Sequence, residues 1–483
     1  MSKSEILTEA KIENLKLKLQ AAHAANRKLH KRVKALSQSR AHQQGKVKVL
    51  QSRIKAQSRV IHASRGAMGA DVVISGHKFG SRMVSLCIAL YAFGGCSFRG
   101  VRRVLLCLQM ELGINESDIP SKSSIDNWIQ KAGHYHYTRE MDLTEDWSEY
   151  CIIVDESMVV GQQRMLLALG VRAHKVGKEA LSFEEVKVLG FAVAASWKWA
   201  EVQSFLEKVA DKMGTKATYV VCDGGANLKK GVSGANLLRI CDVGHEICKL
   251  MEQTYRQDER FLSWIKEVAK VRFQVFMRAT AYLLPPRQRT VARFTNLSSI
   301  VQWAQSMLHV LPTLTTQEQQ TYGWLGEHKE IIQEFANAFK MNESILKILK
   351  NEGLSYQNIE KCLLICQNST STVCKKLIDK IENYLRQEKE KLPDSDTLWH
   401  MSSDILESLF GKFKHLASNN VLNGVTGRVL ALCLLTSGNC ELDQINGYVQ
   451  QALESVSMPE LKQWKMDHLF ENQLLKRQEI FKT

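Results

Sequence analysis

Short hydrophobic runs and amphipathic segments alternate in the middle of the chain. Five apolar runs have the length of strands, and residues 200–213 between the third and fourth have helical periodicity. The order of three strands, a helix, a strand, a short helical link and a fifth strand predicts a mixed α/β sheet. The predicted strands are residues 151–154, 165–171, 186–195, 218–222 and 238–241.

Helical periodicity dominates on both sides of this predicted sheet. Residues 251–395 are amphipathic almost throughout, which predicts an all-α domain after the fifth strand. Helices are also expected between residues 78 and 137, where the segments 97–104 and 121–129 flank a loop. The second segment has a capping serine, small polar residues and then an apolar stripe, so it resembles the recognition helix of a helix-turn-helix module. An ordinary helical hairpin is the alternative.

Residues 12–61 carry a heptad repeat. Branched residues such as Ile12 and Val33 are frequent at one seam position and leucines at the other, and Asn26 is a lone asparagine at the first. This pattern favours a parallel two-stranded coiled coil and therefore a homodimer or higher multimer. Because Arg40 and Gly45 interrupt the repeat, a single helix packed on its own protein is the alternative.

The net charge of +15 is concentrated at the N-terminal end. Residues 1–65 hold 16 Lys or Arg and three Glu, which gives 16 − 3 = +13. A basic arm of this kind predicts nucleic acid as a partner, with a solvated surface as the alternative. The expected DNA contacts are Arg27, Lys28, Lys31, Arg32 and Lys34 in the arm, and Arg99, Arg102, Arg103, Lys122, Ser123 and Asn127 in the helix-turn-helix region.

Composition narrows the cellular setting and the chemistry. The 12 cysteines are scattered in apolar stretches, which is typical of buried thiols in a reducing compartment. The longest apolar run, residues 83–95, is too short to cross a membrane. We therefore expect an intracellular protein without membrane partners, which in a bacterium is cytoplasmic or associated with the nucleoid. No phosphate-binding loop occurs, because Gly177-Lys178 is followed by Glu179.

Two aspartates follow apolar strands. Asp155 comes directly after residues 151–154, and Asp223 comes after residues 219–222 and precedes two glycines. Carboxylates at the ends of neighbouring buried strands would lie close together, and a divalent cation would offset their repulsion. Each aspartate alone would more commonly be a turn or capping residue.

A third acid is expected on a helix near residue 404. Glu407 lies beside the apolar stripe of the predicted helix 403–414, and Lys414 lies two turns further on, where it could contact phosphate. Asp404 is on the same face one turn earlier, and it equally suits a capping role. The sequence therefore favours Glu407 and leaves Asp404 as the alternative.

These features together resemble the catalytic core of DDE-type transposases and integrases. The resemblance covers roughly residues 150–250 and 400–417, and it implies a ribonuclease H-like core with Asp155, Asp223 and Glu407 as catalytic metal ligands. Glu407 lies 184 positions after Asp223, and this looks like the hAT and related transposases, which have an all-α domain at this point. The segment from Cys241 to His245 resembles their (Cys or Asp)-x-x-His motif, which implies that Asp242 and His245 line the active site and contact the scissile region. A capping Asp and an incidental His are the alternative.

The function implied by this resemblance is DNA transposition. Binding of transposon ends and target DNA, strand cleavage and strand transfer would use two Mg²⁺ or Mn²⁺ ions. The alternatives are a transposase-derived scaffold without catalysis and a ribonuclease H-like nuclease. The expected domains are a basic arm (1–65), a helix-turn-helix-like domain (66–145), the first part of the core (146–250), an all-α insertion (251–395) and the second part of the core (396–483).

Overall fold

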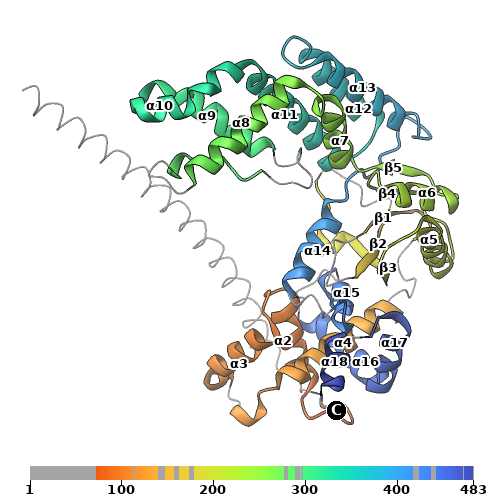
Figure 1. The fold of residues 1–483 in the computed structure, drawn as a ribbon. Helices are drawn as coiled ribbons and strands as arrows, with labels where there is room; N and C mark the ends of the chain where they lie inside the picture. Colours follow the sequence, from red (N-terminus) through yellow and green to blue (C-terminus); the bar gives the residue numbers. More distant parts are fainter. Residues whose placement is uncertain are drawn as a thin grey trace, which may run out of the picture. The chain divides into compact units, whose positions relative to one another are not determined.

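The predicted strands form one mixed sheet in the computed structural model (Figure 1). Strand β2 pairs antiparallel with β1 and β3, whereas β4 runs parallel to β1 and to β5, and the order is β3-β2-β1-β4-β5. Every strand boundary lies within two residues of its predicted position, so the prediction of a mixed five-stranded sheet is confirmed. The strands are β1 (Tyr150–Glu156), β2 (Arg164–Arg172), β3 (Val186–Ala194), β4 (Tyr219–Cys222) and β5 (Arg239–Cys241).

The described chain consists of two units. The predicted coiled coil and the five basic residues from Arg27 to Lys34 lie outside the described residues. Helices α2 (Ser81–Ala92) and α3 (Phe98–Leu112), with the first turn of α16 (Leu442–Ser455), form the smaller unit, and the larger unit begins at Ile119. The structure describes residues 72–112, 115–139, 147–156, 163–172, 179–276, 281–288, 294, 297–416, 424–436, 442–471 and 473–481.

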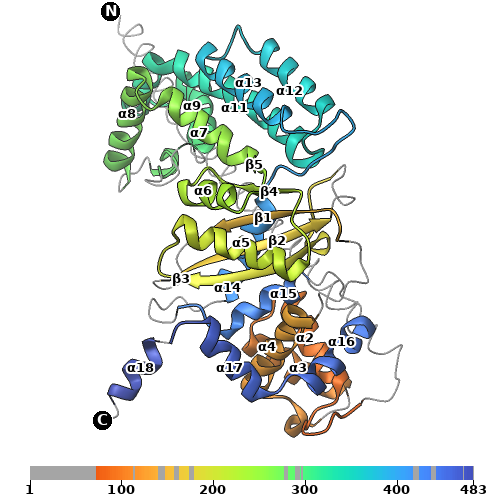
Figure 2. The same ribbon diagram turned by 90° about the vertical axis from the view of Figure 1, so that its right-hand side faces the viewer.

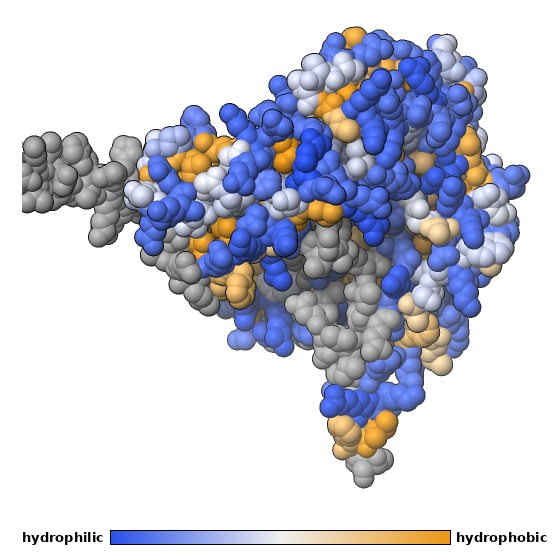
Figure 3. Space-filling model, turned by 45° about the horizontal axis from the view of Figure 1, so that its top comes forward, coloured by the Kyte–Doolittle hydropathy of each residue, from blue (hydrophilic) through white to orange (hydrophobic). Residues whose placement is uncertain are grey.

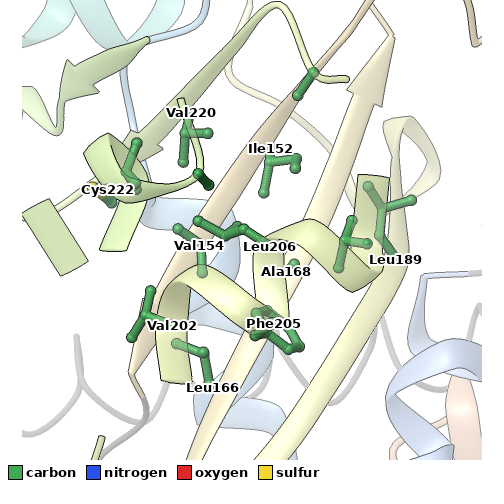
Figure 4. Packing of buried hydrophobic residues seen from close by; sticks show 14 of the residues in the cluster. Ile152, Val154, Leu166, Ala168, Leu189, Val202, Phe205, Leu206, Val220 and Cys222 are labelled. Carbon is green, nitrogen blue, oxygen red and sulfur yellow. The ribbon is translucent and has the colours of Figure 1, made fainter. Parts of the chain in front are cut away.

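One face of the sheet packs against α5 (Trp199–Met213) and α6 (Ala226–Gly234). In β1, Ile152 and Val154 belong to the same hydrophobic cluster as Leu206 of α5 (Figure 4). Successive side chains of a strand point to opposite faces, so Asp155 lies on the other side of the sheet. Burial of each such aliphatic side chain contributes roughly 1.5–3 kcal/mol, which makes this cluster a rigid base for the strand ends.

The other face of the sheet is covered by helices from distant parts of the chain. Helix α14 (Asp404–Leu416) contacts β1, while α4 (Lys122–Arg139) and α15 (Ala431–Leu435) contact β3. Figure 2 shows α5 and α14 on opposite sides of the sheet. Covering both faces suits strands that are apolar on both sides. It also places α14, the helix of Glu407, on the side of Asp155.

Between β5 and α14 the chain is helical, as predicted. Its hydrophobic core includes the aromatic residues Phe261, Trp264 and Phe335, of which Phe261 and Phe335 are stacked. Cys362 and Cys366 are buried on α12, as expected for thiols that pack in a core. The helices are α7 (Val243–Tyr255), α8 (Glu259–Val275), α9 (Leu297–Val310), α10 (Thr316–Tyr322), α11 (Lys329–Asn351), α12 (Tyr356–Asn368) and α13 (Lys375–Lys389).

The two helices predicted for the helix-turn-helix region form as α3 and α4, but they belong to different units. Helix α4 packs against α15 and the short helix Gly427–Leu430 that precedes it. A side chain at Gly133 of α4 would collide with the backbone of Leu430, so this contact requires glycine. The division after Asp118 therefore separates the segments that the sequence places in one DNA-binding domain.

The remaining helices follow α15. On the larger unit, Trp464 of α17 (Met458–His468) contacts Phe191 of β3, and α18 (Gln473–Ile480) ends the described chain. The face drawn in Figure 3 is mostly hydrophilic, and its hydrophobic residues lie in separate groups. Across the described residues, every helix is too short or too polar to span a membrane.

Candidate active site

Three aspartates lie in a row at the carboxyl ends of three adjacent parallel strands. Ile153 of β1 is level with Val221 of β4, and Cys222 of β4 is level with Cys241 of β5. Continuing each register past the last paired residues aligns Asp155 with Asp223 and Asp223 with Asp242. Neighbouring strands are about 4.8 Å apart, so adjacent carboxylates in this row are close.

The carboxylate of Asp155 is electrostatically unfavourable in the absence of a cation. Its pKa is raised to about 7, mainly by burial, then by the charge of Asp223, with a smaller effect from Glu407. The backbone N–H of Glu156 donates to Asp155 Oδ1 at 2.7 Å, and the positive charge of His245 also opposes the rise. Asp155 therefore experiences the charges of both other acids that the sequence assigns to the metal site.

Asp223 ends β4 in a tight turn that leads into α6. Its Oδ1 accepts a hydrogen bond from the backbone N–H of Gly225 at 2.8 Å, and a Cβ at Gly225 would lie only 2.9 Å from that oxygen. The guanidinium group of Arg239 donates to the backbone carbonyl of Asp223 at 3.1 Å. The strand, the turn and Arg239 thus fix the backbone at Asp223.

Asp242 is buried and is not an exposed ligand. Its carboxylate connects α7 to the residue that precedes α14. Its side chain is 1% exposed and caps α7. Oδ1 accepts from the backbone N–H and Nδ1 of His245 at 2.7 and 3.0 Å, and Oδ2 accepts from the backbone N–H and Oγ of Ser403 at 2.6 and 2.9 Å. Burial opposes ionisation, but these hydrogen bonds outweigh it and lower the pKa to about 2. In this conformation Asp242 cannot touch DNA, although it lies beside the candidate site.

His245 bridges two carboxylates. Its Nδ1 contacts Asp242, and its Nε2 lies 3.5 Å from Glu407 Oε1. The hydrogen bond with Asp242 raises its pKa to about 9 against the effect of burial, and the charges of Asp242, Glu407 and Asp223 act in the same direction. An imidazolium ring that donates to Asp242 and forms an ion pair with Glu407 fits this position. His245 thus supplies positive charge beside the row of acids.

The structure distinguishes the two acids of α14. The carboxylate of Asp404 accepts from Lys350 Nζ of α11 at 2.6 and 2.8 Å, whereas Glu407 faces His245. Burial raises the pKa of Glu407, while His245 opposes this rise, and the charge of Glu407 contributes to the raised pKa of Asp155. Glu407 is therefore part of the same electrostatic cluster as Asp155, and Asp404 is occupied by an ion pair.

Carboxylate oxygens are suitable ligands for a hard divalent cation. In this geometry, however, the carboxylates do not surround a common position that a cation could occupy. Among the residues that the structure describes, no three His, Cys, Asp or Glu side chains come together closely enough to hold a metal ion. Asp155 and Asp223 could supply two oxygen ligands, and a cation between them would offset the repulsion that raises the pKa of Asp155. Glu407 would have to turn away from His245 to supply a third.

The expected DNA contacts that the structure describes lie on three helices. Lys414 is partly buried on α14, and its neighbour Lys412 lies over the ring of Phe183, with Nζ 3.7 Å from the centroid. On α3, Arg99 and Arg103 are exposed and Arg102 is partly buried; on α4, Lys122 and Ser123 are exposed and Asn127 is partly buried.

Sequence analysis missed three residues of this site: Arg239, Lys350 and Ser403. Ser403 precedes α14 with the spacing of a capping residue, yet its hydroxyl donates to Asp242, which is 161 positions away. Lys350 lies near the end of a 23-residue helix, and nothing around it in the sequence indicates a partner on α14. Of the three, only Arg239 could have been noticed from its local sequence, because it is a positively charged residue at the start of a short apolar strand.

Replacing Asp155 with asparagine should stabilise the metal-free protein, by roughly 2–4 kcal/mol at pH 8. The carboxyl group has an ordinary pKa of 3.8 and a pKa of about 7 in the folded chain. The wild type therefore loses stability as the pH rises from about 4 to 7, whereas Asp155→Asn does not. Urea unfolding in EDTA at pH 5 and pH 8 measures this, with Glu156→Gln as the control on the same strand. A gain no larger at pH 8 than at pH 5 would contradict this explanation.

No family model matches the chain, and no curated protein matches it.

Proposed function

We propose that the protein is a DDE-type DNA transposase with a ribonuclease H-like core. The observation that carries this proposal is the row formed by Asp155 and Asp223, with Glu407 held next to it on α14 by the contact with His245. The sheet order β3-β2-β1-β4-β5, with an all-α segment between β5 and α14, supports the same fold. The resemblance to hAT-like and bacterial insertion-sequence transposases is then one of layout.

In the proposed reaction, Asp155, Asp223 and Glu407 would hold two Mg²⁺ or Mn²⁺ ions. When bound, the ions would polarise the scissile phosphate and activate the attacking water or 3′ hydroxyl. The protein itself binds and orients: the strand ends fix the two aspartates, and His245 provides a positive charge that holds Glu407 until the metal site assembles. Lys414 would contact a neighbouring phosphate, and joining differs from cleavage only in the nucleophile.

The partners proposed are double-stranded DNA and a second copy of this chain. Residues 1–65 contribute +13 of the total charge of +15, so phosphate binding would be concentrated there. The exposed residues Arg99, Arg103 and Lys122 add positive charge on α3 and α4. Two copies would bring two transposon ends together, and this is the role we assign to the heptad repeat.

A second candidate function is a DNA-binding scaffold derived from a transposase. The observation that favours it is that, within the described part of the chain, the acids do not form a group of three metal ligands, and Glu407 is bound to His245 instead. In this case the acids would no longer support catalysis. Retention of Asp155, Asp223 and Glu407 together favours the first proposal.

The decisive experiment incubates the full-length protein with end-labelled linear DNA that carries the sequences flanking its gene. The transposase proposal predicts cleavage at the element's ends and joining of the freed 3′ end to a target plasmid, in Mg²⁺ or Mn²⁺ but not in EDTA. Binding of the same DNA without cleavage in either metal would overturn it in favour of the scaffold. Cleavage without joining would indicate a nuclease.

A further inference from the structure

Helix α14 has a glycine in its middle that nothing in its packing requires. Outside the helix's own backbone, no atom of the described residues lies within 4 Å of the position that a Cβ of Gly411 would take. Glycine is, after proline, the least favourable residue inside a helix. By contrast, packing requires the glycine at position 231 of α6, where a side chain would meet Val202 at 2.6 Å.

Gly411 lies between an acid and a base of the proposed site. Glu407, Gly411 and Lys414 are spaced by four and three residues, so they occupy successive turns of one face of α14. Glu407 and Gly411 are exposed, and Lys414 is partly buried. Seven residues of helix span about 10 Å, which is longer than the spacing of successive phosphates along one DNA strand.

Two other charged residues of α14 have protein partners. Asp404, one turn before Glu407, binds Lys350 at 2.6 Å, and Lys412 lies over the ring of Phe183. Within the described part of the chain, Lys414 makes no hydrogen bond or ion pair. Among the described residues, none covers the face of α14 at Gly411, which has Glu407 at one end and Lys414 at the other.

We propose that Gly411 keeps this face of α14 clear, so that the backbone of one DNA strand lies directly against the helix between Glu407 and Lys414. This inference rests on the proposed function and names a further position that determines access to the same site. A phosphate at Glu407 would be reached through the bound cations, and a nearby phosphate of the same strand would be reached by Lys414. A long side chain at position 411 would lift the strand off the helix.

The test compares Gly411→Ala and Gly411→Gln with the same changes at Gly447. Gly447 is a matched control, because it is exposed inside α16 and a Cβ there would also meet nothing within 4 Å. All four variants should raise the melting temperature, since each replaces glycine in a helix. Gly411→Gln should reduce strand cleavage and duplex affinity by about tenfold to a hundredfold, with little change for Gly447→Gln. Gly411→Ala should fall in between.

Further readouts separate this inference from the proposed function. The increase in melting temperature caused by Mn²⁺ should be the same in Gly411→Gln and the wild type, because the metal site is untouched. Lys414→Gln should reduce the slope of log affinity against log salt concentration by about one. If the wild type does not cleave DNA, the proposed function fails, and duplex affinity alone decides the role of Gly411. Wild-type affinity in Gly411→Gln, or an equal loss in Gly447→Gln, would overturn the inference.

Discussion

Asp155→Asn and Asp223→Asn should each reduce Mg²⁺-dependent strand cleavage and joining by about a thousandfold or more. Each change removes a charged oxygen ligand from the row at the strand ends, and the remaining acids cannot replace it because they lie on other elements. The same variants should bind duplex DNA as the wild type does, since the positive charge lies elsewhere. Gel analysis of end-labelled DNA measures cleavage, and filter binding measures affinity.

A matched pair on α14 sharpens this prediction. Glu407→Gln should lose activity like the aspartate variants, whereas Asp404→Asn should retain most of it. Both replacements remove one carboxylate from the same helix within one turn, but Glu407 faces His245 and Asp404 faces Lys350. Full activity in Glu407→Gln together with loss in Asp404→Asn would assign the third ligand to Asp404.

Asp242→Ala should destabilise the protein by roughly 3–5 kcal/mol, because it leaves several buried donors without their common acceptor. Four hydrogen bonds end on this carboxylate, two from His245 and two from Ser403. Urea unfolding at pH 7 measures the loss. Asp258→Ala is the control. The side chain of Asp258 also caps a helix by accepting hydrogen bonds from backbone N–H groups, but it is more exposed, so its removal should cost about 1 kcal/mol in stability. Equal losses in the two variants would show that Asp242 is only a cap.

The local parts of the fold were predictable from the sequence. Strands β1 and β4 are uninterrupted apolar runs, and an aspartate after each run is visible without any alignment. The parallel pairing of β1 with β4 then brings Asp155 and Asp223 level. The order of strands and helices and the all-α segment after β5 were also predicted, because hydrophobic periodicity determines them.

The long-range contacts of the site were not predictable in the same way. Ser403 and Asp242 are 161 positions apart, and Lys350 and Asp404 are 54 apart. Hydrogen bonds and ion pairs across such separations leave no periodic signal. For the same reason, the sequence favoured Glu407 over Asp404 but could not show that Asp404 forms an ion pair with Lys350.

The division between α3 and α4 has a comparable cause. The sequence predicts both helices correctly, but the partners of α4 are α15 and the residues before it, about 300 positions later. Propensity and capping determine where a helix begins, whereas packing determines the unit to which it belongs.

The hydrogen bonds between Asp242 and Ser403 affect how the helical segment between β5 and α14 can change in evolution. They join the point where the helical segment leaves the sheet to the point where it returns, and the hydrogen bond from Val243 N–H to the Met401 carbonyl reinforces the closure. The residues between these two points therefore form a long segment whose two ends are held together. Lengthening a loop whose ends are already held together costs little entropy. The helices of this segment can therefore become longer or shorter, or change in sequence, while the strand ends and α14 keep their spacing.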